Sequence, residues 1–270
     1  MGKLLRIEII KTFSSNTFRS LISLHLILFL LVVLAISKID VSFGLFSVDA
    51  LFQFPHVYDF FAWIASWFNI FLAIIGIVLV SNEFRFGTFK QHIIDGLNRE
   101  QLVMGKVQVL LIIAVYGILL VLISSLVSGV IMGEDLSGSA MFKNIDILFV
   151  YFLQTLSYIA MGLFFAVLFK NNALAIITFI LYLFPGEVII RKLLFSDIQR
   201  YFPAKLISDL TPFPEYVSES LQGPGAASQM NFPMQAEPAL SQATSVGMAI
   251  FYFIFFVGLA YWLLKARSFD

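Results

Sequence analysis

Several residue types are scarce or missing in this 270-residue sequence, and each absence excludes a class of chemistry. There is no cysteine, which excludes disulfide bonds, thiolate metal sites and cysteine nucleophiles. The three histidines, His25, His56 and His92, form no His-Glu-x-x-His motif and no pair placed to bind haem or zinc. Charged residues make up only 13% of the chain, against about a quarter in soluble domains, and a net charge of zero gives no sign of a nucleic-acid partner.

Apolar residues, by contrast, are in excess: hydrophobic types make up 60% of the chain, and 31 residues are phenylalanine. One globule could not bury this excess, so lipid must be the solvent for much of the chain. Six runs are long and apolar enough to cross a bilayer, and in lipid they must be helices, which predicts an all-α integral membrane protein. These runs, within a single transmembrane domain over 1–270, are 21–38, 58–80, 103–131, 147–169, 173–190 and 247–264.

The fifth run is expected to break, because Pro185 and Gly186 stand inside it. The segment after it, 191–246, holds six of the eight prolines and is expected to be irregular or re-entrant. Such a long connection could cap an outer exit or serve as a solvated connector.

Lysine and arginine residues predict the orientation of the chain in a membrane. With six spans, the side that carries both termini holds eleven of these residues, and the other side holds six spread over longer loops. We therefore expect a multi-pass protein of the inner or plasma membrane, with both termini and the segment 81–106 in the cytoplasm.

That segment, SNEFRFGTFKQHIIDGLNREQLVMGK, is a polar island with three acids, five bases and three glycines between two spans. Thr88 opens a Thr-x-x-Gln capping box, which predicts a helix starting near Phe89. Gly96 is placed to end this helix, and Asn98 opens a second cap signature that should start the third span. The island is thus predicted to be a short helix held between tight turns.

Phe86, Phe89, Ile93 and Leu97 recur at spacings of three, four and four residues, so we interpret them as one apolar stripe of this helix. The stripe could rest on lipid, or it could dock into a groove of a cytosolic partner. A short, capped helix is suited to passing motion from such a partner into two spans.

The amino terminus, residues 1–19, is basic and rich in leucine and isoleucine, and Ser14, Ser15 and Asn16 interrupt it before the first span. This pattern predicts an interfacial helix on the membrane surface. Its apolar face is imperfect, because Lys11 lies near Leu4 and Ile7 on a helical wheel.

Other membrane functions lack their chemistry here. Ion-driven transporters carry ionisable groups inside the membrane, but His25 is the only such group well inside a predicted span. The stretch PGEVIIR echoes a Glu-Glu-x-x-x-Arg protease motif, but Gly186 replaces the first glutamate and no histidine follows Glu187. No Gly-x-x-x-x-Gly-Lys-Ser/Thr loop is present, so the chain is not expected to hydrolyse ATP itself or to act as an enzyme alone.

In layout and in one motif the sequence resembles the membrane subunits of type-2, or type V, ABC exporters. In that family the loop between spans two and three carries a glutamate, a Gly-Thr pair, an apolar-striped helix, a Pro-x-Ser-Arg turn and a Gly-Lys pair. The residues that match, in the same order and at similar spacing, are Glu83, Gly87, Thr88, Arg99, Gly105 and Lys106. The sequence departs from the family at the turn, where GLNRE replaces the proline-containing stretch.

The resemblance implies a permease that pairs with a second copy or a paralogue and binds separate cytosolic ABC ATPase subunits. The residues that it implies for ATPase docking are Phe86, Phe89, Lys90, Ile93 and Leu97. Glu83 and Arg99 would brace the turns, and Lys106 would lie at the membrane boundary. No cofactor would bind this chain, since ATP and Mg would bind the partner ATPase.

The cargo implied is hydrophobic or amphipathic, such as a lipid, a drug or a lipid-linked sugar, moved outward, with membrane lipids as neighbours. The competing hypothesis is a membrane anchor without transport, which would scaffold an envelope complex through the segment 191–246.

Overall fold

The computed structural model describes residues 2–38, 42–43, 46–94, 96–133, 136–194, 196–214, 217 and 240–266, and this part of the chain is almost entirely helical. The two strands, β1 (Ser42–Phe43) and β2 (Phe46–Ser47), pair as a short antiparallel ribbon. Six helices are long and apolar enough to cross a membrane, as predicted. They are α2 (Asn16–Ile36), α3 (Val57–Arg85), α5 (Arg99–Met132), α7 (Ile147–Phe169), an interrupted helix over Asn172–Lys192, and α13 (Gln242–Ala266).

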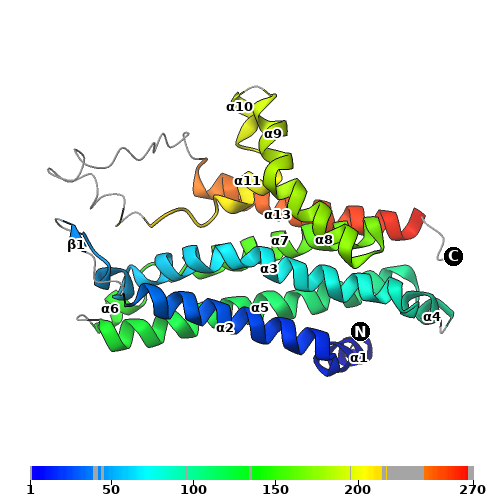
Figure 1. Cartoon of the computed structure of the whole chain (residues 1–270), viewed down its shortest axis with the longest axis horizontal. Helices are drawn as coiled ribbons and strands as arrows, with labels where there is room; N and C mark the ends of the chain where they lie inside the picture. The colour runs from blue at the N-terminus through cyan, green and yellow to red at the C-terminus, as the bar shows by residue number, and fades with distance from the viewer. Residues whose placement is uncertain are drawn as a thin grey trace.

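The long helices form an elongated bundle, with the short helices at its two ends and on one side (Figure 1). α7 is the central helix and packs against α3, α5 and α13. In its most apolar stretch of 18 residues, 78% of the residues are buried. Gly162 permits a close approach of α7 to α3, because a Cβ atom there would lie 2.9 Å from the carbonyl oxygen of Ala73 on α3. In the most apolar 18-residue stretch of α2 only 17% of the residues are buried, which leaves most of that helix for contact with lipid.

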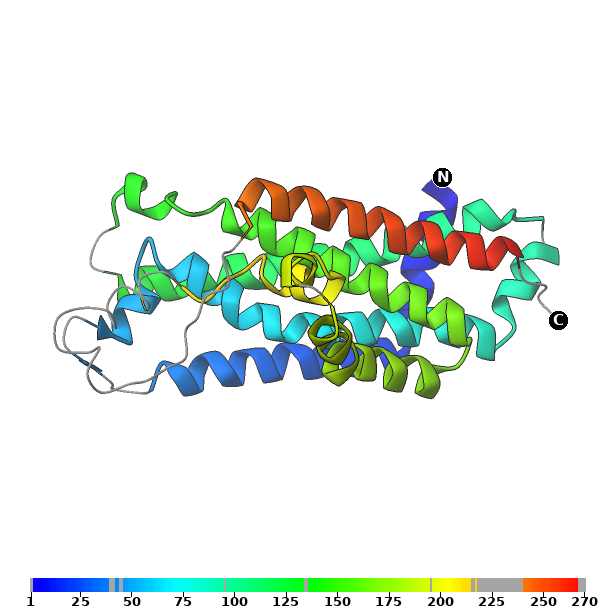
Figure 2. The ribbon, with the colours of Figure 1, turned by 90° about the horizontal axis from the view of Figure 1, so that it is seen from above.

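The amino terminus forms α1 (Gly2–Ser14), which lies across the end of the bundle and contacts α2 and α5 (Figure 2). The predicted interruption is present: Ser15 has an extended backbone, and its hydroxyl accepts from the amide of Phe18 to cap α2. The chain therefore turns sharply between a crosswise helix and the first span. This geometry is what an interfacial helix requires.

The fifth span breaks where it was predicted to break. α8 (Asn172–Leu181) leads into a wide π-helical turn, η2 (Tyr182–Gly186), in which Phe184 has the non-helical angles φ −141° and ψ 107°. Pro185 removes an amide donor, and a Cβ atom on Gly186 would lie 2.7 Å from the carbonyl oxygen of Leu181. The helices that follow are α9 (Glu187–Lys192), α10 (Ser196–Gln199) and α11 (Pro203–Ser208).

α9 and α10 project sideways from the bundle near the middle of its length, and α11 returns the chain to the bundle (Figures 1 and 2). Within the segment expected to be irregular or re-entrant, 191–246, residues 195, 215–216 and 218–239 lie outside the described residues. The remaining short elements are η1 (Asp49–Phe52), α4 (Thr88–Ile94) and α6 (Gly138–Met141). η1 and α6 lie at one end of the bundle, and α4 lies at the other (Figure 1).

Candidate functional site

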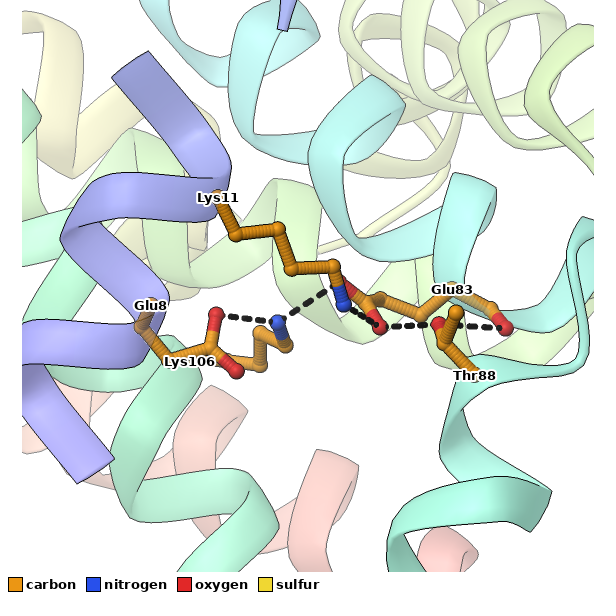
Figure 3. Close-up of polar contacts among 5 residues, drawn as sticks. All are labelled: Glu8, Lys11, Glu83, Thr88 and Lys106. Atoms are coloured by element: carbon orange, nitrogen blue, oxygen red, sulfur yellow. Dashed lines mark hydrogen bonds and ion pairs between the residues drawn. The ribbon is translucent and has the colours of Figure 1, made fainter. Parts of the chain in front are cut away.

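Four charged side chains from three helices meet beside α4 (Figure 3). Lys106 on α5 donates from Nζ to Oε1 of Glu83 on α3 at 2.8 Å and to Oε2 of Glu8 on α1 at 2.6 Å. Lys11, one turn after Glu8, donates to Oε2 of Glu83 at 2.6 Å. We call these residues, Glu8, Lys11, Glu83 and Lys106, the ionic cluster.

Three members of the ionic cluster are buried and Lys11 is partly exposed, and the formal charges cancel, since the cluster contains two acids and two bases. Glu8 is 2% exposed, and Glu83 and Lys106 are each 5% exposed. Desolvating such groups is costly unless every charge has a partner, and removing one partner leaves a buried charge uncompensated. The cluster therefore fixes α1 in one position against α3 and α5.

Thr88 joins the ionic cluster to the start of α4. Its hydroxyl donates to the carboxylate and the carbonyl oxygen of Glu83 (Figure 3). α3 ends at Arg85, and Gly87 then takes φ +66°, a left-handed conformation that glycine adopts without strain. Glu83 thus bonds at once to the lysines and to the first residue of α4.

The predicted short helix is confirmed, but its first cap differs from the prediction. The amide of Gln91 donates to the carbonyl of Gly87, so Gly87 stands in the N-cap place, and Thr88 uses its hydroxyl on Glu83 instead. At the other end Gly96 has φ +92°, and the amides of Gly96 and Leu97 donate back into the helix as in a Schellman motif.

The next span begins as predicted. Asn98 accepts from the amide of Gln101, and the Gln101 side chain accepts from the amide of Asn98, a complete capping box. Arg99 follows at once and donates to the carbonyl oxygen of Leu264 at 2.9 Å and to that of Lys265. A cation on the last carbonyls of a helix is favourable, so the start of α5 holds the end of α13.

The predicted apolar stripe is not one exposed face. Phe89 is 1% exposed and packs on Phe84, with ring centroids 4.6 Å apart, beneath the Nζ of Lys106 at 5.9 Å. Ile93 and Leu97 are partly buried against the same core. Burial inside this chain removes Phe89 from the surface that a partner could contact.

The exposed apolar residues at α4 are Phe86 and Ile94, whose exposed fractions are 69% and 76%. Ile94 was not among the residues predicted for docking. Gly105 is buried in α5. The side chain of Lys90 lies outside the described residues. The surface of α4 therefore offers Phe86 at its base and Ile94 at its last turn.

Two of the four charges in the ionic cluster were not identified from the sequence. Glu8 is the only acid in the α1 sequence, and it lies one turn before Lys11, the residue that spoils the apolar face. An acid and a base on the otherwise apolar side of an interfacial helix are a signal that a buried ionic partner exists. The sequence does not say which partner, because Glu8 and Lys106 are 98 residues apart.

A second polar network, also not identified from the sequence, lies farther along the bundle. Gln154 on α7 accepts from the side chains of Asn69 and Thr211, each at 3.1 Å, and donates to the carbonyl oxygen of Ile207 at 2.9 Å. Thr155 donates to Asn69 at 2.8 Å. These bonds tie the returning helix α11 to the centre of the bundle.

A cavity of about 210 Å³ adjoins the ionic cluster and is lined by Lys11, Glu83, Phe86, Thr88 and Lys106 among others. Within the described residues no group of three or more His, Asp or Glu side chains could hold a metal ion. The charges of the ionic cluster are bonded to one another, so the arrangement connects α1, α3 and α5.

Comparison with protein-family models matches residues 44–268 to a family described as "Protein of unknown function (DUF2705)". No curated protein matches the chain.

Proposed function

The chain belongs to the DUF2705 family, and we propose that it is the membrane subunit of an exporter of the type V ABC class. In this role it binds a separate cytosolic ATPase through α4 and moves a hydrophobic or amphipathic substrate outward. It pairs with a second membrane subunit to enclose the path.

The observation that carries the proposal is the meeting of three motif residues in one site. Glu83, Thr88 and Lys106 are taken from the resemblance to the exporters. Thr88 and Lys106 lie five and 23 residues after Glu83, and both bond to its carboxylate. A surface helix that only rests on lipid does not need the buried ionic cluster beneath it, because burying these charges costs desolvation energy.

The connections of α4 and of the turn after it support a coupling role. The base of α4 is bonded through Glu83 to α1 and α5, and Arg99, just after α4, is bonded to the end of α13. A force applied to α4 would therefore move α1, α3, α5 and α13 together. Small displacements are passed on in this way because close-packed elements shift as units.

The exposed face of α4 supports binding to a partner. Phe86 and Ile94 are large apolar side chains that are exposed beside and on α4, at one end of the bundle. Apolar anchors that enter pockets of a partner commonly dominate binding energy.

The experiment is to purify the tagged chain gently from its native membrane and identify the proteins that accompany it. We expect a stoichiometric ABC-type ATPase, lost on Ile94→Asp but kept on Phe142→Asp, a matched control at an apolar residue 70% exposed at the other end of the bundle. Monodisperse elution of both variants would show that the fold survives. An ATPase that stays bound to Ile94→Asp and to Phe86→Asp would contradict docking at α4.

A further inference from the structure

A cavity of about 750 Å³ lies between α3, α7 and the returning segment α9–α11. This volume is within the range of ligand pockets, roughly 300–1,000 Å³. One part of the lining is aromatic and includes Trp63, Trp67 and Phe184. Another part is basic and consists of Arg191, Arg200 and Lys205. The cavity therefore offers both kinds of surface that an amphiphile needs.

The basic part has an excess of positive charge. Among the described residues, the only acid that lines the cavity is Asp209, which pairs with Lys205 at 2.5 Å. The Nε atoms of Arg191 and Arg200 are buried and have no hydrogen-bond partner among the described residues. Both arginines thus line the cavity, and each has one buried donor without a partner among the described residues.

The nearby buried acid forms no ion pair with them among the described residues, because its oxygens accept from other groups. Glu187 is 1% exposed and accepts from the amides of Ala204 and Lys205, at 2.8 and 2.7 Å, and from the hydroxyl of Tyr182 at 2.8 Å. It caps the first turn of α11 and does not line the cavity.

The position of the arginines makes the unused donors costly. α9 and α10 leave the bundle near the middle of its length (Figures 1 and 2), so the segment that carries Arg191 and Arg200 lies level with the middle of the long apolar helices. Ionisable groups at such depth are rare and commonly mark a binding site or a substrate path. An anion that enters from the lipid phase would supply the missing acceptors.

We propose that this cavity binds a lipid with an anionic phosphate headgroup, with the phosphate on Arg191 and Arg200 and the acyl chains along Trp63, Trp67 and Phe184. Planar guanidinium groups bind phosphate through paired, charge-assisted hydrogen bonds. The lipid is the cargo class of the exporter, an identification that rests on the proposed function. Binding itself does not depend on the ATPase, so it can be tested separately.

The chain provides its own reporters, since two of its three tryptophans line the cavity and the third, Trp262, does not. In the Trp262→Phe background, fluorescence quenching would be titrated in detergent micelles with phosphatidic acid brominated on its acyl chains. Brominated phosphatidylcholine would be titrated in parallel. We expect phosphatidic acid to bind about tenfold more tightly, as paired charge-assisted bonds imply.

The double variant Arg191→Gln/Arg200→Gln should reduce this preference to roughly twofold or less, because it removes the charged donors. Lys192→Gln makes the same kind of change on an exposed residue of α9 outside the cavity lining, and it should keep the preference. Equal quenching by both lipids in the unsubstituted protein would overturn the proposal. So would an equal loss of preference in Lys192→Gln, which would indicate general surface charge.

The source of the phosphate is tested by competition. Unbrominated phosphatidic acid should relieve the quenching, and glycerol 3-phosphate at the same concentration should not. Equal competition by glycerol 3-phosphate would assign the site to a free phosphate ester and overturn the lipid assignment. If no ATPase accompanies the unsubstituted protein and its lipid preference is still observed, the result would instead count against the proposed function alone.

Discussion

Replacing Lys106 tests whether the ionic cluster holds the amino-terminal helix to the bundle. Lys106→Met keeps the length of the side chain but removes the cation that lies 2.6 Å from Glu8 and 2.8 Å from Glu83. The cluster then carries two acids and one base, with both acids buried. Breaking a buried ion pair in this way costs about 3–5 kcal/mol, so we expect the free energy of unfolding to fall by that amount.

A second substitution that restores the charge balance tests whether the loss of stability comes from the unpaired buried carboxylates. Glu8→Gln combined with Lys106→Met leaves Glu83 and Lys11 as a neutral pair, with Glu83 accepting at 2.6 Å. The double variant should be more stable than Lys106→Met, with a residual loss of about 1–3 kcal/mol because the new amide at position 8 is buried without its partner. Non-additivity of this size is what a direct interaction produces.

The assay is reversible unfolding in mixed micelles, followed by helical circular dichroism, for the two single variants and the double variant. Lys192→Met, at an exposed lysine, controls for the change of residue type. A Lys106→Met protein within about 1 kcal/mol of the parent, or a double variant less stable than either single one, would refute the reasoning.

Other predictions follow from particular contacts. Gly162→Ala should lower the free energy of unfolding by about 1–3 kcal/mol, because the new Cβ would lie 2.9 Å from the carbonyl of Ala73, while Gly247→Ala, with open space around it, should not. Glu187→Gln should speed hydrogen exchange of the amides at the start of α11 roughly tenfold, since these amides would lose a charged acceptor, and unchanged exchange there would count against the cap. Arg99→Ala should speed exchange in the last turn of α13 without affecting α11, and equal effects on both helices would indicate a general loss of stability.

The spans could be predicted from the sequence because hydropathy and length are local properties. The run predicted over 147–169 coincides with α7, and the break at Pro185 follows from the missing amide donor. The capping box at Asn98 was predictable for the same reason, since its partner is three residues away.

The ionic cluster could be predicted only in part. The resemblance singled out Glu83 and Lys106 but gave no contact between them, and their other partners come from a helix about 70 to 100 residues away in the chain. Periodicity places Phe89 on the apolar side of α4, but it cannot say whether that side faces the bundle or a partner. In the structure Phe89 packs against Phe84, and Ile94 is exposed.

The central claim is that α4 contacts an ATPase, and site-specific crosslinking in native membranes tests it most directly. Because the chain has no cysteine, Ile94→Cys and Phe142→Cys would each place one thiol at an exposed position, at opposite ends of the bundle. A short thiol-to-amine crosslinker should join Ile94→Cys to an ABC-type ATPase identified by mass spectrometry, and Phe142→Cys should not capture it. Capture of no ATPase from Ile94→Cys, or equal capture from both positions, would contradict the account.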